Sequence, residues 1–228
     1  MVYKGLSPPS LLDSYTAERL PVIAEMLNIT TGLLNKMHKA TTIEGAMKHG
    51  KRLNMLGVNY RASPIVVDEY TRAEPVGAYG DLEEGDLVAG DRAPDASGLT
   101  LVSNGVERET TLFDVFSATY HTVLVFTPDP TRTMGTLEVL KGYPRDVIRP
   151  VVVLPQGSVA KTVAKVDTIV DQGGHAYRAY LAVKGARKVV IVRPDGVAGA
   201  IVHGAEGVRA YFDKIFTYHH DHIFRSLL

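Results

Sequence analysis

The chain has 228 residues, enough for one medium-sized domain with an appendage. Its 25 basic and 25 acidic residues cancel, so the composition does not attract a polyanion, and we expect no nucleic-acid partner. The absence of cysteine excludes disulfides, thiolate catalysis and thiolate metal sites. The longest apolar runs are much shorter than a membrane span, so we expect a cytoplasmic protein with no membrane partner.

The first predicted element is a long amphipathic helix over residues 10–40. Ser10 and Asp13 have the spacing of a capping box at its start. Pro21 has no N–H to bond the Ala17 carbonyl, so we expect a kink or a break there. Residues 41–62 are ambiguous because glycines interrupt the helical pattern. Apolar residues recur near the helical period at Leu11, Leu12, Tyr15, Val22, Ile23, Met26, Leu27, Leu33, Leu34 and Met37.

Residues 63–90 are expected to be a connecting segment with one short strand at 65–67. The pattern beyond residue 90 alternates between strands and helices. It predicts strands at 121–127, 147–154 and 168–171, and helices at 111–118, 131–142, 158–165, 175–183 and 207–216. Two apolar runs around Pro194-Asp195-Gly196 predict a β-hairpin over 188–202. This order of elements predicts an α/β sandwich around a mixed sheet.

Four segments resemble the C-terminal part of class A flavoprotein monooxygenases of the phenol hydroxylase type. They are residues 11–22 (LLDSYTAERLPV), 56–69 (LGVNYRASPIVVDE), 89–94 (AGDRAP) and 190–196 (VIVRPDG). The resemblance implies a thioredoxin-like, peroxiredoxin-like α/β sandwich with an N-terminal helical appendage. We therefore divide the chain into a helical segment at 1–62, a connecting segment at 63–90, a thioredoxin-like domain at 91–218 and a tail at 219–228.

Two motifs of these families are missing from the sequence. No G-x-G-x-x-G follows a strand, and the Gly-Asp motif of the flavin site would fall ahead of residue 1. The resemblance therefore implies no FAD site of the family's kind, and we expect no cofactor. Thioredoxins and peroxiredoxins act through a cysteine after the first core strand, where residues 126–132 read FTPDPTR. Thiol peroxidase activity is thereby excluded.

Several polar groups are candidate sites, each with a plainer interpretation. Arg193 and Asp195 are candidates for positioning an anionic ligand, but we favour a turn closed by an ion pair. Residues 90–92 are interpreted in the same way, as the turn that opens the domain. The histidine-rich segment 218–222 contains common metal ligands, but it lies in a terminal tail, and we predict no metal site. His121, His175 and His203 are candidate general acids or bases, but we interpret them as structural because none has a visible partner.

The remaining candidate site is the surface that a missing flavin domain would leave exposed. We expect His49 to lie on this surface. Its predicted ligand-binding residues lie in the helical segment and just after it, and the alternative is plain core or dimer packing. No residue is assigned a catalytic role. The predicted lining is Met26, Leu33, Met37, His38, Tyr60 and Arg61.

Three hypotheses for the function follow. The first is a cofactor-independent cyclase or isomerase, or a small-molecule-binding protein, of secondary metabolism. It would act on a small apolar molecule by positioning alone. The second is a non-catalytic dimerisation or accessory module of a flavin monooxygenase. The third is a fragment of a longer oxygenase. We favour the first, and we expect a homodimer because the chain has no net charge to oppose self-association.

Overall fold

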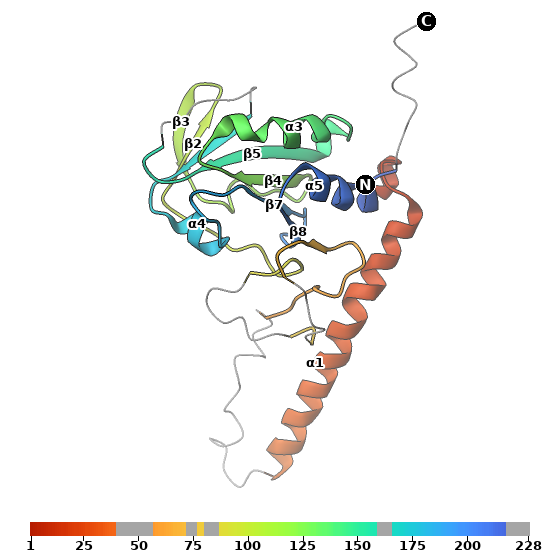
Figure 1. The fold of residues 1–228 in the computed structure, drawn as a ribbon. Coiled ribbons are helices and arrows are strands. Elements are labelled where there is room, and N and C mark those ends of the chain that lie inside the picture. The colour runs from red at the N-terminus through yellow and green to blue at the C-terminus, as the bar shows by residue number, and fades with distance from the viewer. Residues whose placement is uncertain (40–56, 72–76, 80–86, 159–165, 218–228) are drawn as a thin grey trace, which may run out of the picture.

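The computed structural model describes residues 1–39, 57–71, 77–79, 87–158 and 166–217. Within them, a mixed eight-stranded sheet flanked by helices forms an α/β domain, and the long helix α1 runs beside it (Figure 1). Three sequence predictions fall outside the described residues: His49, the helix at 158–165 except for residue 158 itself, and the histidine-rich tail.

The N-terminal segment begins with two short 3-10 helices, η1 (Val2–Lys4) and η2 (Pro9–Leu12). Helix α1 follows as one helix over Asp13–Lys39. The predicted start at Ser10 is wrong because η2 occupies that position. Of the kink or break predicted at Pro21, the break is also wrong, since α1 continues through this residue. Ala17 and Pro21 are both exposed, so water can bond the carbonyl that the proline leaves unpaired.

Four strands and two helices build the centre of the domain. β4 lies parallel to β5 and antiparallel to β7, and β7 forms a hairpin with β8. One helix connects β4 to β5, and another follows the hairpin. This βαβ unit followed by a hairpin and a helix confirms the predicted thioredoxin-like fold. The elements are β4 (His121–Phe126), α3 (Met134–Leu140), β5 (Ile148–Leu154), β7 (Lys188–Val192), β8 (Ala198–Val202) and α5 (Ala205–Ile215).

The remaining strands extend the sheet at both edges, in the order β1-β8-β7-β4-β5-β6-β2-β3. A 3-10 turn, η4 (Pro130–Thr133), precedes α3, and η5 (Arg145–Val147) precedes β5. The predicted strand at 65–67 corresponds to β1, which is shorter and begins later. The hairpin of β2 and β3 was not predicted. The bounds are β1 (Val67–Asp68), β2 (Leu99–Ser103), β3 (Val106–Thr110), β6 (Asp167–Asp171) and α4 (His175–Ala179).

The helix predicted over 111–118 is absent, and the chain makes turns there instead. The Asp114 carboxylate accepts a hydrogen bond from the Thr111 backbone N–H at 3.1 Å. The Asp95 carboxylate accepts one from the Phe113 backbone N–H at 2.9 Å. These side chains offer the backbone partners that compete with a helix. Leu112 and Val115 still bury their side chains fully, so the apolar residues of the segment reached the core without helical structure.

The sheet separates two hydrophobic cores. Val123 and Val125 of β4 face α3 and α5, whereas Leu124 and Phe126 face α4 and the loop before β4. α5 buries the stripe that its spacing predicted, which includes Tyr211 and Phe212. Figure 1 shows α3 and α5 on one side of the sheet and α4 on the other. β4, β7 and β8 are thus buried along their whole length, whereas β3 is largely exposed. α1 contacts the domain at the β7–β8 hairpin.

Candidate functional site

A buried ion pair fixes α1 to the domain. The Arg193 guanidinium, on the β7–β8 hairpin, donates to both carboxylate oxygens of Glu18 at 2.6 and 3.0 Å. Only 6% of the Glu18 side chain and 11% of the Arg193 side chain are exposed. The Ser63 hydroxyl also donates to Glu18, at 2.7 Å. Two charges buried this deeply need full pairing to be tolerated, so the contact holds α1 in one position.

Arg193 has a second partner in Asp195, two residues further along the turn. Its Nε and Nη2 donate to the two Asp195 carboxylate oxygens at 3.1 and 2.6 Å. Burial opposes the charge on Arg193, but the bonds to Glu18 and the negative charge of Asp195 outweigh it and raise its pKa. The guanidinium also lies 5.9 Å from the centroid of the Tyr60 ring. The hairpin is therefore closed by an ion pair, as we interpreted it from the sequence.

Of the predicted lining residues, Tyr60 contacts α1, and its neighbour Arg61 joins the connecting segment to the domain. The Tyr60 hydroxyl accepts a hydrogen bond from Arg19 of α1 at 3.3 Å. Arg61 makes a two-point ion pair with Asp91, at 2.7 and 2.9 Å. Gly90 next to it has φ +102°, and a side chain there would meet the Tyr60–Arg61 backbone. Residues 90–92 thus form the turn that opens the domain, with Asp91 bonded to the connecting segment.

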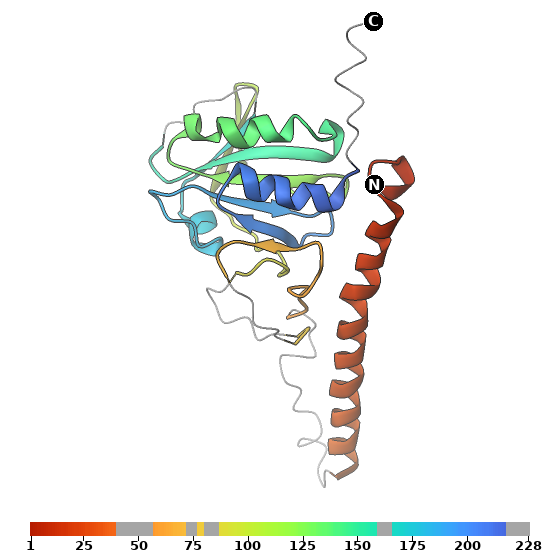
Figure 2. The ribbon, with the colours of Figure 1, turned by 45° about the vertical axis from the view of Figure 1, so that its right-hand side comes forward.

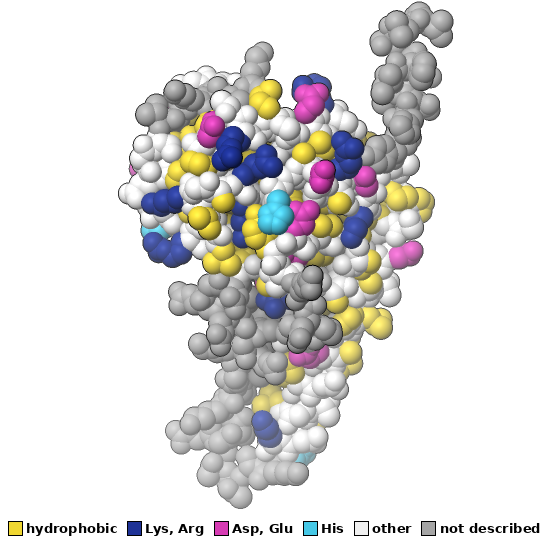
Figure 3. All heavy atoms as spheres, viewed as in Figure 1, with side chains coloured by type: hydrophobic (Ala, Val, Ile, Leu, Met, Phe, Trp, Pro, Cys, Tyr) yellow, Lys and Arg dark blue, Asp and Glu magenta, His cyan; other side chains and the backbone are white. Residues whose placement is uncertain are grey.

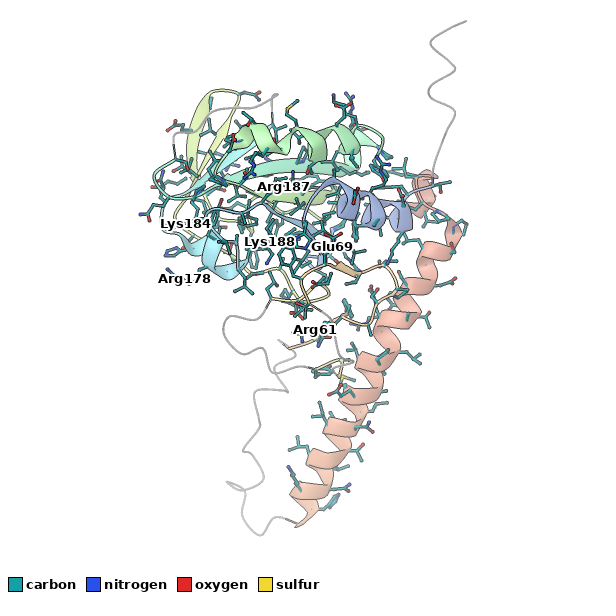
Figure 4. All side chains as sticks on the ribbon, in the orientation of Figure 1. Arg61, Glu69, Arg178, Lys184, Arg187 and Lys188 are labelled. Carbon is teal, nitrogen blue, oxygen red and sulfur yellow. The ribbon has the colours of Figure 1, made fainter. Side chains whose placement is uncertain are left out.

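A second polar cluster supports the sheet edge at β1 (Figure 4). Lys188 of β7 is buried and donates to the Tyr180 carbonyl at 2.9 Å, just beyond the C-terminus of α4. Burial lowers the pKa of Lys188. Its Nζ lies 4.7 Å from the centroid of the Tyr70 ring. Glu69 accepts a bond from the His203 backbone N–H at 2.6 Å. The bond from Lys188 to the Tyr180 carbonyl supports the end of α4. α4 is shorter than the helix predicted at 175–183.

The other face of α1 has a row of exposed apolar side chains, which we call the outer stripe. It consists of Leu20, Ile23, Leu27 and Leu34, whose side chains are between 44% and 65% exposed. At 3.6 residues per turn, the four lie within about 60° of helix rotation. Figure 2 shows α1 running on past the domain, and Figure 3 shows hydrophobic side chains along its length. α1 is apolar on two faces, and the domain covers one of them.

The other predicted lining residues are not gathered into one site. Met26 and Leu33 are half-buried on the inner side of α1, and His38 is exposed. The side chain of Met37 lies outside the described residues. In the part of the chain that the structure describes, no group of three acidic or histidine side chains is placed to hold a metal ion. None of the described helices is long and apolar enough to cross a membrane.

The comparisons with known proteins agree with the motifs. A flavin-dependent monooxygenase of Mycobacteroides abscessus is 34% identical over 120 residues, which is 53% of this chain and 20% of that protein. The pentachlorophenol 4-monooxygenase of Sphingobium chlorophenolicum is 30% identical over 172 residues, or 69% of this chain and 28% of that protein. This chain is related to flavin-dependent monooxygenases. No protein-family model matches it.

Solved structures agree on the fold. Aklavinone-11 hydroxylase, solved with FAD and aklavinone, matches 94% of this chain with a TM-score of 0.60 and 20% identity. The flavin-dependent monooxygenase PieE, solved with FAD and substrate, matches 93% with a TM-score of 0.58 and 16% identity. The chain spans less than a third of the two curated relatives and 37% and 40% of these two structures. A partial match of this kind fits the C-terminal part that the motifs indicated.

Proposed function

We propose that this chain is a non-catalytic accessory module of a flavin-dependent monooxygenase. Its outer stripe would dock on the flavin-binding part of such an enzyme. The observation that carries the proposal is the exposure of four large apolar side chains in a row on a helix that is already attached by its other face. Exposed apolar patches of this length on soluble proteins commonly mark binding surfaces.

The choice of a flavin-binding partner rests on what the relatives have and this chain lacks. The matched region is only 20% and 28% of the two curated monooxygenases, so most of each relative lies outside it. The two solved relatives contain FAD, and each also contains a helix and domain like these. The residues described here contribute no glycine-rich nucleotide loop. A separate flavin-binding surface therefore accounts for both the missing motif and the uncovered stripe.

Size-exclusion chromatography tests this proposal. The probe is the FAD-loaded part of the Mycobacteroides abscessus monooxygenase, cut ahead of the region that this chain matches. We expect it to elute together with this chain, with flavin absorbance in the shared peak. Leu27→Arg should weaken the complex at least about tenfold because it buries a charge in the apolar contact. Asn28→Arg is the control, since it adds the same charge about 100° around the helix.

Two results would count against the docking proposal. One is separate elution of the two proteins at micromolar concentrations, with FAD still bound to the probe. The other is a dimer of this chain that Leu27→Arg dissociates, because the stripe would then serve the homodimer that the composition led us to expect. Either result would remove the reason to assign the stripe to a flavin-binding partner.

A second candidate function is the one favoured from the sequence, a cofactor-independent cyclase or isomerase, or a small-molecule-binding protein. The observation in its favour is a pocket of about 400 Å³ between the N-terminal turns and the end of the sheet. This volume suits a small ligand. The pocket does not involve the outer stripe, so the two proposals are tested independently.

A further inference from the structure

The pocket lies where the N-terminal segment crosses the domain. Its walls include Leu11, just ahead of α1, Ile65 of the connecting segment, and Ile215 at the end of α5. His121, the first residue of β4, and Tyr211 of α5 also line it. These two side chains are 3% and 0% exposed. The pocket thus combines apolar walls with two buried polar side chains from different elements.

The two buried side chains each carry an unused hydrogen-bonding atom. Among the described residues, neither His121 Nδ1 nor the Tyr211 hydroxyl has a hydrogen-bond partner. Polar atoms buried to this extent in native proteins are nearly always paired, with protein, water or ligand. The His121 and Tyr211 rings meet edge to face with centroids 5.8 Å apart, so the two side chains belong to one cluster. A molecule in the pocket would provide the missing partners.

The charged side chains around the pocket favour an uncharged ligand. Arg193 lines it, but Glu18 and Asp195 already neutralise its guanidinium. Burial, and then the nearby charge of Arg193, lower the pKa of His121 to about 3, so the imidazole is neutral at neutral pH. Burial raises the pKa of Tyr211, which therefore keeps its proton as a donor. Among the side chains that line the pocket, the one cation, Arg193, and the one carboxylate, Asp195, bind each other, so neither is free for a charged ligand. The remaining charge at the pocket is the α-amino group of Met1, which also lines it.

A hydroxyl group fits both orphan atoms. It accepts a hydrogen bond from the Tyr211 hydroxyl and donates one to an imidazole nitrogen that carries no proton. It also accepts from the nitrogen in the other tautomer, so it suits either state of His121. We propose that this pocket binds a small, uncharged molecule with an apolar ring body and one hydroxyl group, held between Tyr211 and His121. The proposal deepens the second candidate function and does not depend on docking through α1.

Isothermal titration of the whole chain with 2-naphthol tests the site. We expect saturable binding of one molecule. We expect 2-methoxynaphthalene, which cannot donate a hydrogen bond, to bind at least about tenfold more weakly, the loss that corresponds to one hydrogen bond. The anion 2-naphthoate should also bind more weakly. Equal affinity for 2-naphthol and 2-methoxynaphthalene, or no saturation by 2-naphthol at millimolar concentrations, would overturn the proposal.

Two tyrosine variants separate binding from folding. Tyr211→Phe should weaken 2-naphthol binding about tenfold without lowering the unfolding temperature, because the hydroxyl bonds no described residue. Tyr177→Phe is the matched control on the opposite face of the sheet. Its hydroxyl donates to the Val153 carbonyl at 3.0 Å, so this change should lower the unfolding temperature and leave binding unchanged. Unchanged binding in Tyr211→Phe would reject the site. Leu27→Arg should bind 2-naphthol normally, whatever it does to docking.

Discussion

At the scale of single residues, His121 is the clearest case of a side chain whose environment sets its chemistry. Its ring packs edge to face against Phe212 and Phe216, with centroid distances of 5.5 and 6.1 Å. The ring also contacts Tyr211, and the positive charge of Arg193 opposes protonation of the imidazole. The folded protein therefore excludes a proton that the unfolded chain binds readily.

The pH dependence of stability follows from this exclusion. The pKa of His121 is about 3 in the folded protein and about 6.5 in an unfolded chain. Its contribution to stability is therefore complete above about pH 6.5 and is lost as the pH falls towards 3. Between about pH 7 and about pH 5, the loss is about 2 kcal/mol. Urea unfolding at both values should show this slope in the native chain and a flatter one in His121→Gln. His175→Gln is the control, and equal slopes for native chain and His121→Gln would contradict the assignment.

The ion pair of Glu18 and Arg193 is the residue-level contact on which the position of α1 depends. Glu18→Gln leaves the buried guanidinium with Asp195 alone and should lower the free energy of unfolding by about 3 kcal/mol. Asp195→Asn removes the more exposed partner, whose side chain is 48% accessible. It should therefore cost less than about 1 kcal/mol. Urea denaturation measures both. Similar losses for the two variants would show that burial does not set the strength of these pairs.

At the scale of elements, α1 departs furthest from simple helix rules. It is a 27-residue helix, about 40 Å long, with a proline in its first half. The inner face is fixed by the bonds of Glu18, by buried Val22 and by Glu25, whose carboxylate accepts from the Tyr79 backbone N–H at 3.2 Å. These contacts flank Pro21 on both sides along the helix. Tertiary attachment therefore compensates for the missing hydrogen bond at the proline.

Pro21→Ala tests this explanation at the element scale. The exchange restores the backbone bond to the Ala17 carbonyl and removes a residue that costs a helix interior up to about 3 kcal/mol. We therefore expect a higher free energy of unfolding and slower amide exchange in α1. Thr16→Ala, at another exposed helix position, should change stability by only about 0.5 kcal/mol. Unchanged or lower stability in Pro21→Ala would mean that the native helix is already adapted to the proline.

At the scale of the whole molecule, α1 is attached to the domain by one face and exposes large apolar side chains on the other. One face is joined to the domain by buried charges, and the other presents the outer stripe. Most of each related flavin-dependent monooxygenase lies outside the matched region, and on the docking proposal the stripe would face a part of that kind. The pocket near His121 is lined by the N-terminal turns and the domain and includes no residue of the outer stripe. Docking and ligand binding can therefore succeed or fail independently.

The amino-acid sequence determined the core of this protein because its signals are local. The apolar run of β4, the Pro194-Asp195-Gly196 turn and the apolar spacing of α5 each predicted an element that the structure contains. The monooxygenase resemblance came from short motifs that lie in the same order along the chain. Tyr60 bonds Arg19 of α1 and Arg61 bonds Asp91, whereas the ligand-binding roles given to Met26, Leu33, Met37, His38, Tyr60 and Arg61 stay predictions.

Only the tertiary structure decided which distant side chains meet. Glu18 and Arg193 are 175 residues apart, and no local pattern indicates that they pair. His121 begins a mostly apolar strand and was interpreted as structural for want of a visible partner, and Tyr211 lies within an apolar helical stripe, so the sequence did not indicate that the two meet. Burial by both elements removed water from their polar atoms and created the candidate ligand site. Pairing and desolvation depend on distances through space, which the order of residues along the chain does not specify.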